Sequence, residues 1–207
     1  MLIGIDFDNT IVDYNEVFVT LANERKLLNQ YFGGGKQEVR DQLLARDLEF
    51  EWRDLQAAAY GNRMNEAPIM SGFPDFIVRA RSEGVELKIV SHKTLFSNLT
   101  SKGTNFRHAA LRWMTKFNFF QDLGFKDTDI YFEDTRDAKI DRITALECSH
   151  FIDDLEEVLC HRSWPSVTAR LLFANESQLG VSGLPTFPNW DAITNTLWSS
   201  NNGEVAA

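Results

Sequence analysis

Carboxylate, hydroxyl and amine side chains stand at the ends of three apolar runs of this sequence. They are Asp6, Asp8 and Thr10 at the end of the run at 2–7, Ser91, His92, Lys93 and Thr94 after the run at 86–90, and Asp153 and Asp154 after the run at 149–152. If these runs are parallel strands, their carboxyl ends meet at one edge of a sheet, which is where α/β proteins bind ligands. Four carboxylates gathered there would repel one another without a cation, so they indicate a hard, oxygen-preferring divalent ion.

Strand and helix patterns alternate along the chain and predict how these side chains are positioned. Apolar runs typical of strands lie at 2–7, 86–90, 129–132, 149–152 and 170–174. Apolar residues with helical spacing lie at 15–31, 36–60, 73–82, 106–118 and 136–146. This alternation predicts an α/β fold with a Rossmann-like, mostly parallel sheet flanked by helices.

Composition and charge narrow the choice of partners and compartment. The chain has 207 residues, which fits one domain or one domain with an insertion. Its formal net charge of -9 argues against a nucleic-acid partner, and its apolar runs are too short to cross a bilayer. Two cysteines are too few for a disulfide framework, and core-like residues open the chain, so we expect a cytoplasmic protein without a signal peptide. The sequence leaves the oligomeric state open.

Turns, calcium loops and receiver domains also gather acidic residues, but each of them fits this sequence less well. A turn or helix-cap role could account for any one of these residues, but not for the whole set in this order. A calcium loop that begins at Asp6 would need Gly at its sixth position and Glu at its twelfth, and these are Ile11 and Val17. A receiver domain carries an acidic pair after its first strand and the phosphorylated Asp after a middle one, an order that this chain lacks.

The order of these motifs closely resembles that of the haloacid dehalogenase (HAD) superfamily of phosphohydrolases. The first motif is Asp6-Phe7-Asp8-Asn9-Thr10, Ser91 is the second, a lysine is the third and Asp153-Asp154 is the fourth. The match spans residues 2–159, which is most of the chain. Lys139, which opens the helix before the strand at 149–152, fits the third motif, and Lys93 is the competing candidate.

The resemblance implies a role for each motif residue in phosphoryl transfer. Asp6 would be the nucleophile that forms an aspartyl-phosphate. Asp8 would protonate the leaving oxygen and then activate water. Thr10 and Ser91 would donate hydrogen bonds to phosphoryl oxygens, and Lys139 would balance the charge between Asp6 and the phosphate.

The resemblance also implies Mg²⁺ as the cofactor. The metal ligands would be Asp6, the backbone carbonyl of Asp8, and Asp153 or Asp154. Which of the last two binds Mg²⁺ directly stays open at this point. The expected function is hydrolysis of a small phosphomonoester, with a phosphotransferase and a catalytically silent binding protein as the alternatives.

Residues 13–72 lie where this superfamily places a helical cap that closes over the site. We therefore expect an α/β core at 1–12 and 73–198, a small helical cap at 13–72 and a flexible tail at 199–207. The cations of the cap segment are candidate substrate contacts and include Arg25, Lys36, Arg40, Arg46, Arg53 and Arg63. The sequence does not identify the phosphorylated metabolite.

Overall fold

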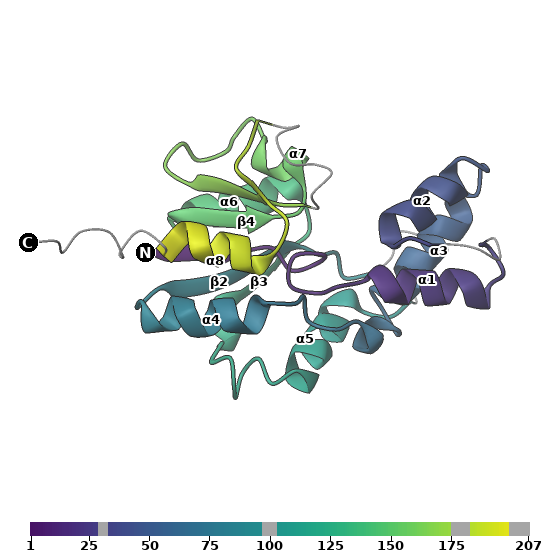
Figure 1. The fold of residues 1–207 in the computed structure, drawn as a ribbon, viewed down its shortest axis with the longest axis horizontal. Coiled ribbons are helices and arrows are strands. Elements are labelled where there is room, and N and C mark those ends of the chain that lie inside the picture. Colours follow the sequence, from purple (N-terminus) through teal and green to yellow (C-terminus); the bar gives the residue numbers. More distant parts are fainter. Residues whose placement is uncertain (29–32, 97–102, 175–182, 199–207) are drawn as a thin grey trace, which may run out of the picture. The chain divides into compact units, whose positions relative to one another are not determined.

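The computed structural model describes residues 1–28, 33–96, 103–174 and 183–198. The chain forms two compact units, which Figure 1 colours along the sequence. The first unit contains Met1–Ile11, Met70–His92 and Phe125–Ala207, and the second contains Val12–Ile69 and Lys93–Gly124. The cap boundaries at 13–72 stay a prediction, and the tail predicted at 199–207 lies outside the described residues.

The first unit is built on a six-stranded sheet with the order β3-β2-β1-β4-β5-β6. The strands are β1 (Leu2–Ile5), β2 (Glu86–His92), β3 (Ile130–Glu133), β4 (His150–Asp153), β5 (Ala169–Phe173) and β6 (Thr186–Phe187). All neighbouring strands pair in parallel, and Ile5 is in register with Ile89 of β2 and Ile152 of β4. The predicted Rossmann-like parallel sheet is confirmed, and β1 lies near its centre.

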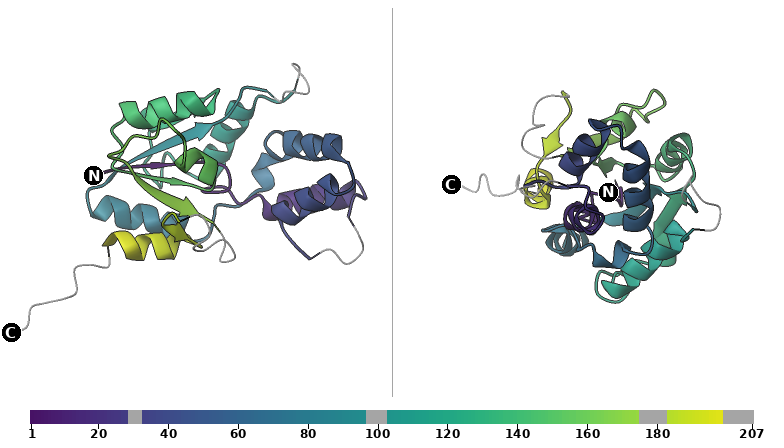
Figure 2. Two further views of the ribbon diagram at one scale, coloured as in Figure 1. Left: turned by 90° about the horizontal axis from the view of Figure 1, so that it is seen from above. Right: turned by 90° about the vertical axis from the view of Figure 1, so that its right-hand side faces the viewer.

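Helices cover this sheet on both faces (Figure 1 and Figure 2, left). The helices of the first unit are α4 (Phe73–Ser82), α6 (Arg136–Ala145), α7 (Glu156–Leu159) and α8 (Trp190–Trp198), with a 3₁₀ turn at Asp127–Asp129. On one face, Leu172 of β5 belongs to a core cluster with residues of α6 and α7. On the other face, Phe173 packs against Trp190 of α8 at a ring-centroid distance of 5.4 Å. Neighbouring residues of one strand thus face two separate cores, as the two-residue period of a strand requires.

The second unit is helical. Its elements are α1 (Asn15–Glu24), α2 (Lys36–Leu44), α3 (Glu49–Ala59), a 3₁₀ turn at Met64–Glu66 and α5 (Phe106–Lys116). Phe18 of α1 stacks on Trp52 of α3 with a centroid distance of 4.9 Å, which packs these two helices together. Asn15 Oδ1 accepts a hydrogen bond of 3.0 Å from the Lys36 amide and thereby ties the start of α2 to the start of α1.

Three parts of the predicted secondary structure differ from the structure. The helix predicted at 36–60 is two helices, because Asp47 adopts φ 56° and interrupts it. Of the helix predicted at 15–31, α1 ends at Glu24, and residues 29–31 lie outside the described residues. The strand β6 and the helices α7 and α8 were not predicted at all.

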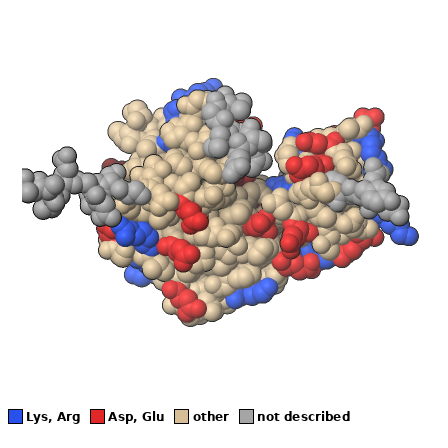
Figure 3. All heavy atoms as spheres, in the orientation of Figure 1, with Lys and Arg blue, Asp and Glu red and all other residues tan. Residues whose placement is uncertain are grey.

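The described surface carries charges of both signs. On the face drawn in Figure 3, Lys and Arg atoms lie between Asp and Glu atoms. Ion pairs between described residues include Arg79 with Glu83 along α4, at 2.7 Å. Within the described part of the chain, every helix is too short or too polar to span a lipid bilayer.

Candidate active site

The first strand and the fourth strand bring Asp6 and Asp153 together. Asp6 follows β1, and its amide donates a hydrogen bond of 2.9 Å to the Ile152 carbonyl of the neighbouring β4. Asp153 is the last residue of β4. The residues are 5% and 0% exposed, so both carboxylates are withdrawn from water. Buried carboxylates need compensating charge or hydrogen bonds.

Lys139 supplies that compensation. Its Nζ donates to Oδ1 of Asp6 at 2.5 Å and to Oδ2 of Asp153 at 2.6 Å. Lys139 lies in the first turns of α6, which begins after Thr135, whose hydroxyl accepts a hydrogen bond from the Ala138 amide at 3.1 Å. Burial opposes the ammonium charge, but the two carboxylates outweigh burial and raise the pKa of Lys139 above its usual range. Lys139 therefore stays charged between two acidic groups.

Lys93, the competing lysine, belongs to the second unit. Its Nζ lies 5.3 Å from the centre of the Tyr60 ring, and its carbonyl accepts a hydrogen bond of 2.8 Å from Nε of Arg107. The two lysines thus have different surroundings, and Lys139 is the one that bridges Asp6 and Asp153.

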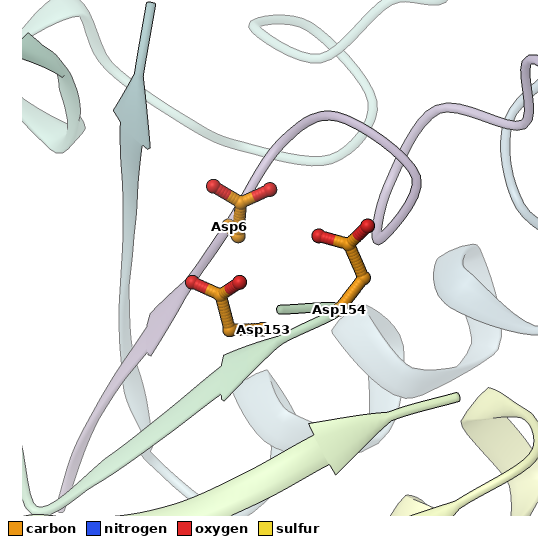
Figure 4. A group of neighbouring side chains, drawn as sticks. All are labelled: Asp6, Asp153 and Asp154. Atoms are coloured by element: carbon orange, nitrogen blue, oxygen red, sulfur yellow. The ribbon is translucent and has the colours of Figure 1, made fainter. Parts of the chain in front are cut away.

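Asp6, Asp153 and Asp154 form a group that fits a metal ion. Each offers a carboxylate oxygen, and the three oxygens lie within 4.8 Å of one another. Figure 4 shows that the three carboxylates gather beyond the ends of β1 and β4. An all-oxygen, acidic set of ligands suits Mg²⁺ or another hard divalent ion.

The electrostatics of Asp6 support the same interpretation. Burial raises the pKa of Asp6 well above its usual range, Lys139 opposes this shift, and the carboxylates of Asp153, Asp154 and Asp8 raise the pKa further. A divalent cation at these carboxylates would favour the ionised form and reverse the shift. Asp8 thus contributes to the electrostatics of Asp6 as the smallest of these causes.

The two neighbouring aspartates of the fourth motif are held differently. Both oxygens of Asp153 accept hydrogen bonds, Oδ2 from Lys139 and Oδ1 from the Leu155 amide at 2.9 Å. Asp154 Oδ2 accepts a hydrogen bond of 3.1 Å from the side-chain amide of Asn9. Asp153 therefore shares the ammonium group of Lys139 with Asp6, and the side-chain amide of Asn9 donates to Asp154.

Thr10 places an unusual hydroxyl in this region. Thr10 is fully buried, and its Oγ1 has no hydrogen-bond partner among the described residues. An unsatisfied buried polar group typically costs about 1–3 kcal/mol, so such a hydroxyl commonly meets an ordered water, an ion or a ligand. The Thr10 carbonyl accepts a hydrogen bond of 3.0 Å from Nε1 of the buried Trp190, which fixes the backbone of the turn.

Ser91, the second predicted phosphate-binding residue, is buried on β2, the strand beside β1. Strand pairing thus places it next to the strand that leads into Asp6. His92 follows it and lines an open groove of about 500 Å³ together with Thr135, Arg136 and His161. Asp6, Asp153 and Asp154 do not line this groove.

Two residues of the site carried no predicted role. Asn9 lies inside the first motif, but its contact with Asp154 joins residues 145 positions apart. Trp190 opens a helix that the sequence pattern did not reveal. The pair Pro188-Asn189 was the available signal, because Asn189 Oδ1 accepts a hydrogen bond from the Ala192 amide as a helix N-cap does.

The cations predicted as candidate substrate contacts lie in the second unit, and most are paired there. Arg25 lies 3.8 Å from Glu51, Arg40 lies 3.9 Å from Asp41, Arg53 lies 2.6 Å from Glu49, Arg63 lies 2.8 Å from Glu24, and Arg46 donates to the Leu27 carbonyl at 2.6 Å. Exposed pairs of this kind contribute little to stability, and the role of these cations as substrate contacts stays a prediction. Lys36 differs, since its Nζ lies 5.5 Å and 5.6 Å from the ring centres of Phe18 and Tyr60.

Comparison with known proteins identifies the fold. The sequence matches no protein-family model and no curated protein. The structure is similar to a HAD family hydrolase from Deinococcus radiodurans R1 with bound phosphate and sodium, at 14% identity and a TM-score of 0.59, over 95% of this chain and 94% of that one. It is similar to a HAD-superfamily hydrolase of subfamily IA from Geobacter sulfurreducens PCA, at 11% identity and a TM-score of 0.54, over 95% of each chain. It is also similar to a hydrolase from Pseudomonas syringae, at 12% identity and a TM-score of 0.53, over 95% of this chain and 97% of that one.

At these identities the likeness establishes the fold. This chain has the fold of the HAD-superfamily hydrolases, as its motifs predicted.

Proposed function

We propose that this chain is a Mg²⁺-dependent phosphatase that hydrolyses a small phosphomonoester through an aspartyl-phosphate on Asp6. The observation that carries the proposal is the contact of Lys139 with both Asp6 and Asp153. These two aspartates, together with Asp154, form the acidic group that fits a metal ion. The hydrolase fold supports the same reaction class, and the similar hydrolase from Deinococcus radiodurans has bound phosphate.

Asp6 is the nucleophile of the proposed reaction. Lys139 holds Oδ1 of Asp6 and so limits rotation of the carboxylate. An oxygen of Asp6 attacks phosphorus, and the bond between phosphorus and the leaving oxygen breaks. Asp8 donates a proton to that oxygen, which leaves as an alcohol.

Water completes the cycle. Asp8, now ionised, takes a proton from water, and the water oxygen attacks the phosphorus of the aspartyl-phosphate. The bond between phosphorus and Asp6 breaks, which restores the Asp6 carboxylate and releases inorganic phosphate. Asp8 ends the cycle protonated, as it began.

The remaining residues stabilise negative charge on the phosphoryl group. Thr10 and Ser91 would donate hydrogen bonds to its oxygens, and the buried Thr10 hydroxyl would thereby gain a partner. Lys139 would offset the charge of Asp6 and of the phosphate. Mg²⁺, held by Asp6, the Asp8 carbonyl and Asp153 or Asp154, would neutralise phosphoryl charge when bound.

A phosphate-release assay over a panel of phosphorylated metabolites, with Mg²⁺ and with excess chelator, tests this proposal. We expect release with Mg²⁺, loss of activity on chelation and recovery when Mg²⁺ is restored. Asp6→Asn should lose several orders of magnitude in rate, as removal of a nucleophile does. Asp75→Asn, at an acidic position in the first turn of α4, is the control and should keep full activity.

The same assay distinguishes the alternatives. A phosphotransferase would form a phosphorylated product only when an acceptor alcohol is added. A binding protein would release no phosphate from any substrate. Full activity of a metal-free preparation in excess chelator would contradict the mechanism.

A further inference from the structure

Asn9 occupies a backbone position that few residues tolerate. Its φ is 60°, in the left-handed region where glycine is found routinely and asparagine or aspartate occasionally. It lies in the turn after β1, which the Ile11 amide closes by donating to the Phe7 carbonyl at 3.0 Å. The backbone therefore restricts this position to a few residue types, and the side-chain contact distinguishes among them.

The side chain of Asn9 reaches across to the fourth motif. Its Nδ2 donates to Oδ2 of Asp154 at 3.1 Å in a partly buried setting. Glycine would fit the turn but could not make this bond, and aspartate would place a second negative charge against Asp154. Asparagine alone among the three combines the backbone conformation with a hydrogen-bond donor.

The three carboxylates of the acidic group differ in what holds them. Lys139 contacts Asp6 and Asp153 and offsets their charge. The amide of Asn9 orients Asp154 without offsetting its charge, because an amide is neutral. The Asn9 amide thus holds one oxygen of the Asp154 carboxylate and leaves the other oxygen of that carboxylate outside this bond.

We infer that Asn9 is a positioning residue, whose amide holds Asp154 in the orientation that binds the divalent cation. This inference rests on the proposed function, because it assigns the cation to the acidic group. It also makes Asp154 the residue of the Asp153-Asp154 pair that binds the metal directly. Hydrogen-bond partners of metal ligands typically change metal affinity by about 10–100-fold when they are removed.

The test is a calorimetric titration of the full chain with Mg²⁺ in the absence of substrate. Asn9→Gly keeps the left-handed backbone and removes only the amide side chain, so folding should be preserved. We expect its Mg²⁺ dissociation constant to rise at least about tenfold. In a turnover assay, activity at saturating Mg²⁺ should return, because the substitution affects metal binding and not the chemical step.

Asn118→Gly is a matched control. Asn118 also has a left-handed backbone, with φ 55°, and its Nδ2 also donates to an aspartate, Asp122 Oδ2, at 2.9 Å. It lies in the second unit, in the turn after α5. Asn118→Gly should therefore leave the Mg²⁺ dissociation constant unchanged. Melting of both variants in excess chelator reports any general loss of stability.

The outcomes separate this inference from the proposed function. Equal Mg²⁺ affinity of Asn9→Gly and wild type, or an equal loss in Asn118→Gly, would overturn the role of Asn9. Weaker binding by Asn9→Gly, with no phosphomonoester hydrolysed by the wild type, would contradict only the phosphatase proposal. A wild-type protein that binds no Mg²⁺ would contradict both.

Discussion

Nζ of Lys139 lies 2.5 Å from Oδ1 of Asp6, and Lys139 and Asp6 are 133 positions apart in the chain. The same ammonium group contacts Asp153 at 2.6 Å. Because all three residues are buried, we expect this arrangement to affect both the stability of the first unit and the proposed reaction.

Replacing Lys139 should therefore be costly in both respects. Lys139→Met leaves two buried carboxylates without their cation, and loss of one partner from a buried pair typically costs about 3–5 kcal/mol. We expect that loss in the free energy of unfolding, measured by urea denaturation in excess chelator, together with loss of turnover. Lys88→Met is the control. Lys88 pairs with Asp129, which immediately precedes β3 and so lies at the amino end of that strand. This substitution should therefore lower stability without affecting turnover. An unchanged stability of Lys139→Met would contradict this electrostatic interpretation.

Thr10→Val should separate stability from activity. Valine has the shape of threonine but lacks the hydroxyl, which has no partner in the described part of the protein. We expect the free energy of unfolding to rise by about 1 kcal/mol, because an unsatisfied buried group is removed. Phosphatase activity should fall, because a donor to the phosphoryl group is lost.

Thr168→Val is the matched control for that experiment. The Thr168 hydroxyl is also buried, but it donates to the Cys148 carbonyl at 2.6 Å. This substitution should lower the free energy of unfolding and leave activity intact. A Thr10→Val variant that is less stable and fully active would contradict the role given to Thr10.

Asp8→Asn should depend on the leaving group. Alkyl phosphates need a proton on the departing oxygen, whereas activated aryl phosphates leave as stable anions. General acid-base assistance is worth about 10²–10⁴-fold, so kcat/KM for alkyl phosphates should fall further than for aryl phosphates by roughly that factor. Equal losses on both substrate classes would assign Asp8 to the metal site alone.

The stability of the metal-free protein should depend on pH through Asp6. The pKa of Asp6 in the folded protein lies above its unfolded value, because burial disfavours the charged form. The folded state then binds a proton that the unfolded state does not bind, in the window between the usual Asp pKa of about 3.9 and the raised folded value. Lowering the pH through this window should stabilise the folded protein in chelator.

Urea denaturation of wild type and Asp6→Asn across this window isolates that contribution. The difference in unfolding free energy between the two proteins should shrink as the pH falls, and Mg²⁺ should reduce its dependence on pH. A difference that does not change with pH would show that the Asp6 pKa is not raised.

The sheet could be predicted because its strands are buried on both faces. Buried parallel strands are continuous apolar runs, and those at 2–7, 86–90 and 149–152 end in the polar residues of the site. The same pattern could not reveal β6, because Thr186–Phe187 is too short to show a period. Helix α8 was missed because it follows this short strand and shows only Trp190 and Ile193 as buried residues.

The contacts within the site depend on tertiary structure that a sequence pattern does not contain. Lys139 and Lys93 both fitted a lysine motif, and only the packing of α6 against the sheet distinguishes their surroundings. The bond from Asn9 to Asp154 requires β1 and β4 to be neighbours, which follows from the strand order. The catalytic roles of Asp6, Asp8, Thr10, Ser91 and Lys139 stay predictions that the experiments above address.

Direct detection of a phosphoryl group on Asp6 tests the proposed mechanism at its centre. Wild type and Asp8→Asn would be incubated with Mg²⁺ and an activated aryl phosphate, whose departure does not need the proton from Asp8, then quenched in acid during turnover, digested and analysed by mass spectrometry. We expect a phosphoryl group on Asp6, at higher occupancy in Asp8→Asn because water attack has lost its base, and none in Asp6→Asn. A phosphoryl group on a different residue, or an unmodified Asp6 in both proteins during turnover, would contradict the aspartyl-phosphate mechanism.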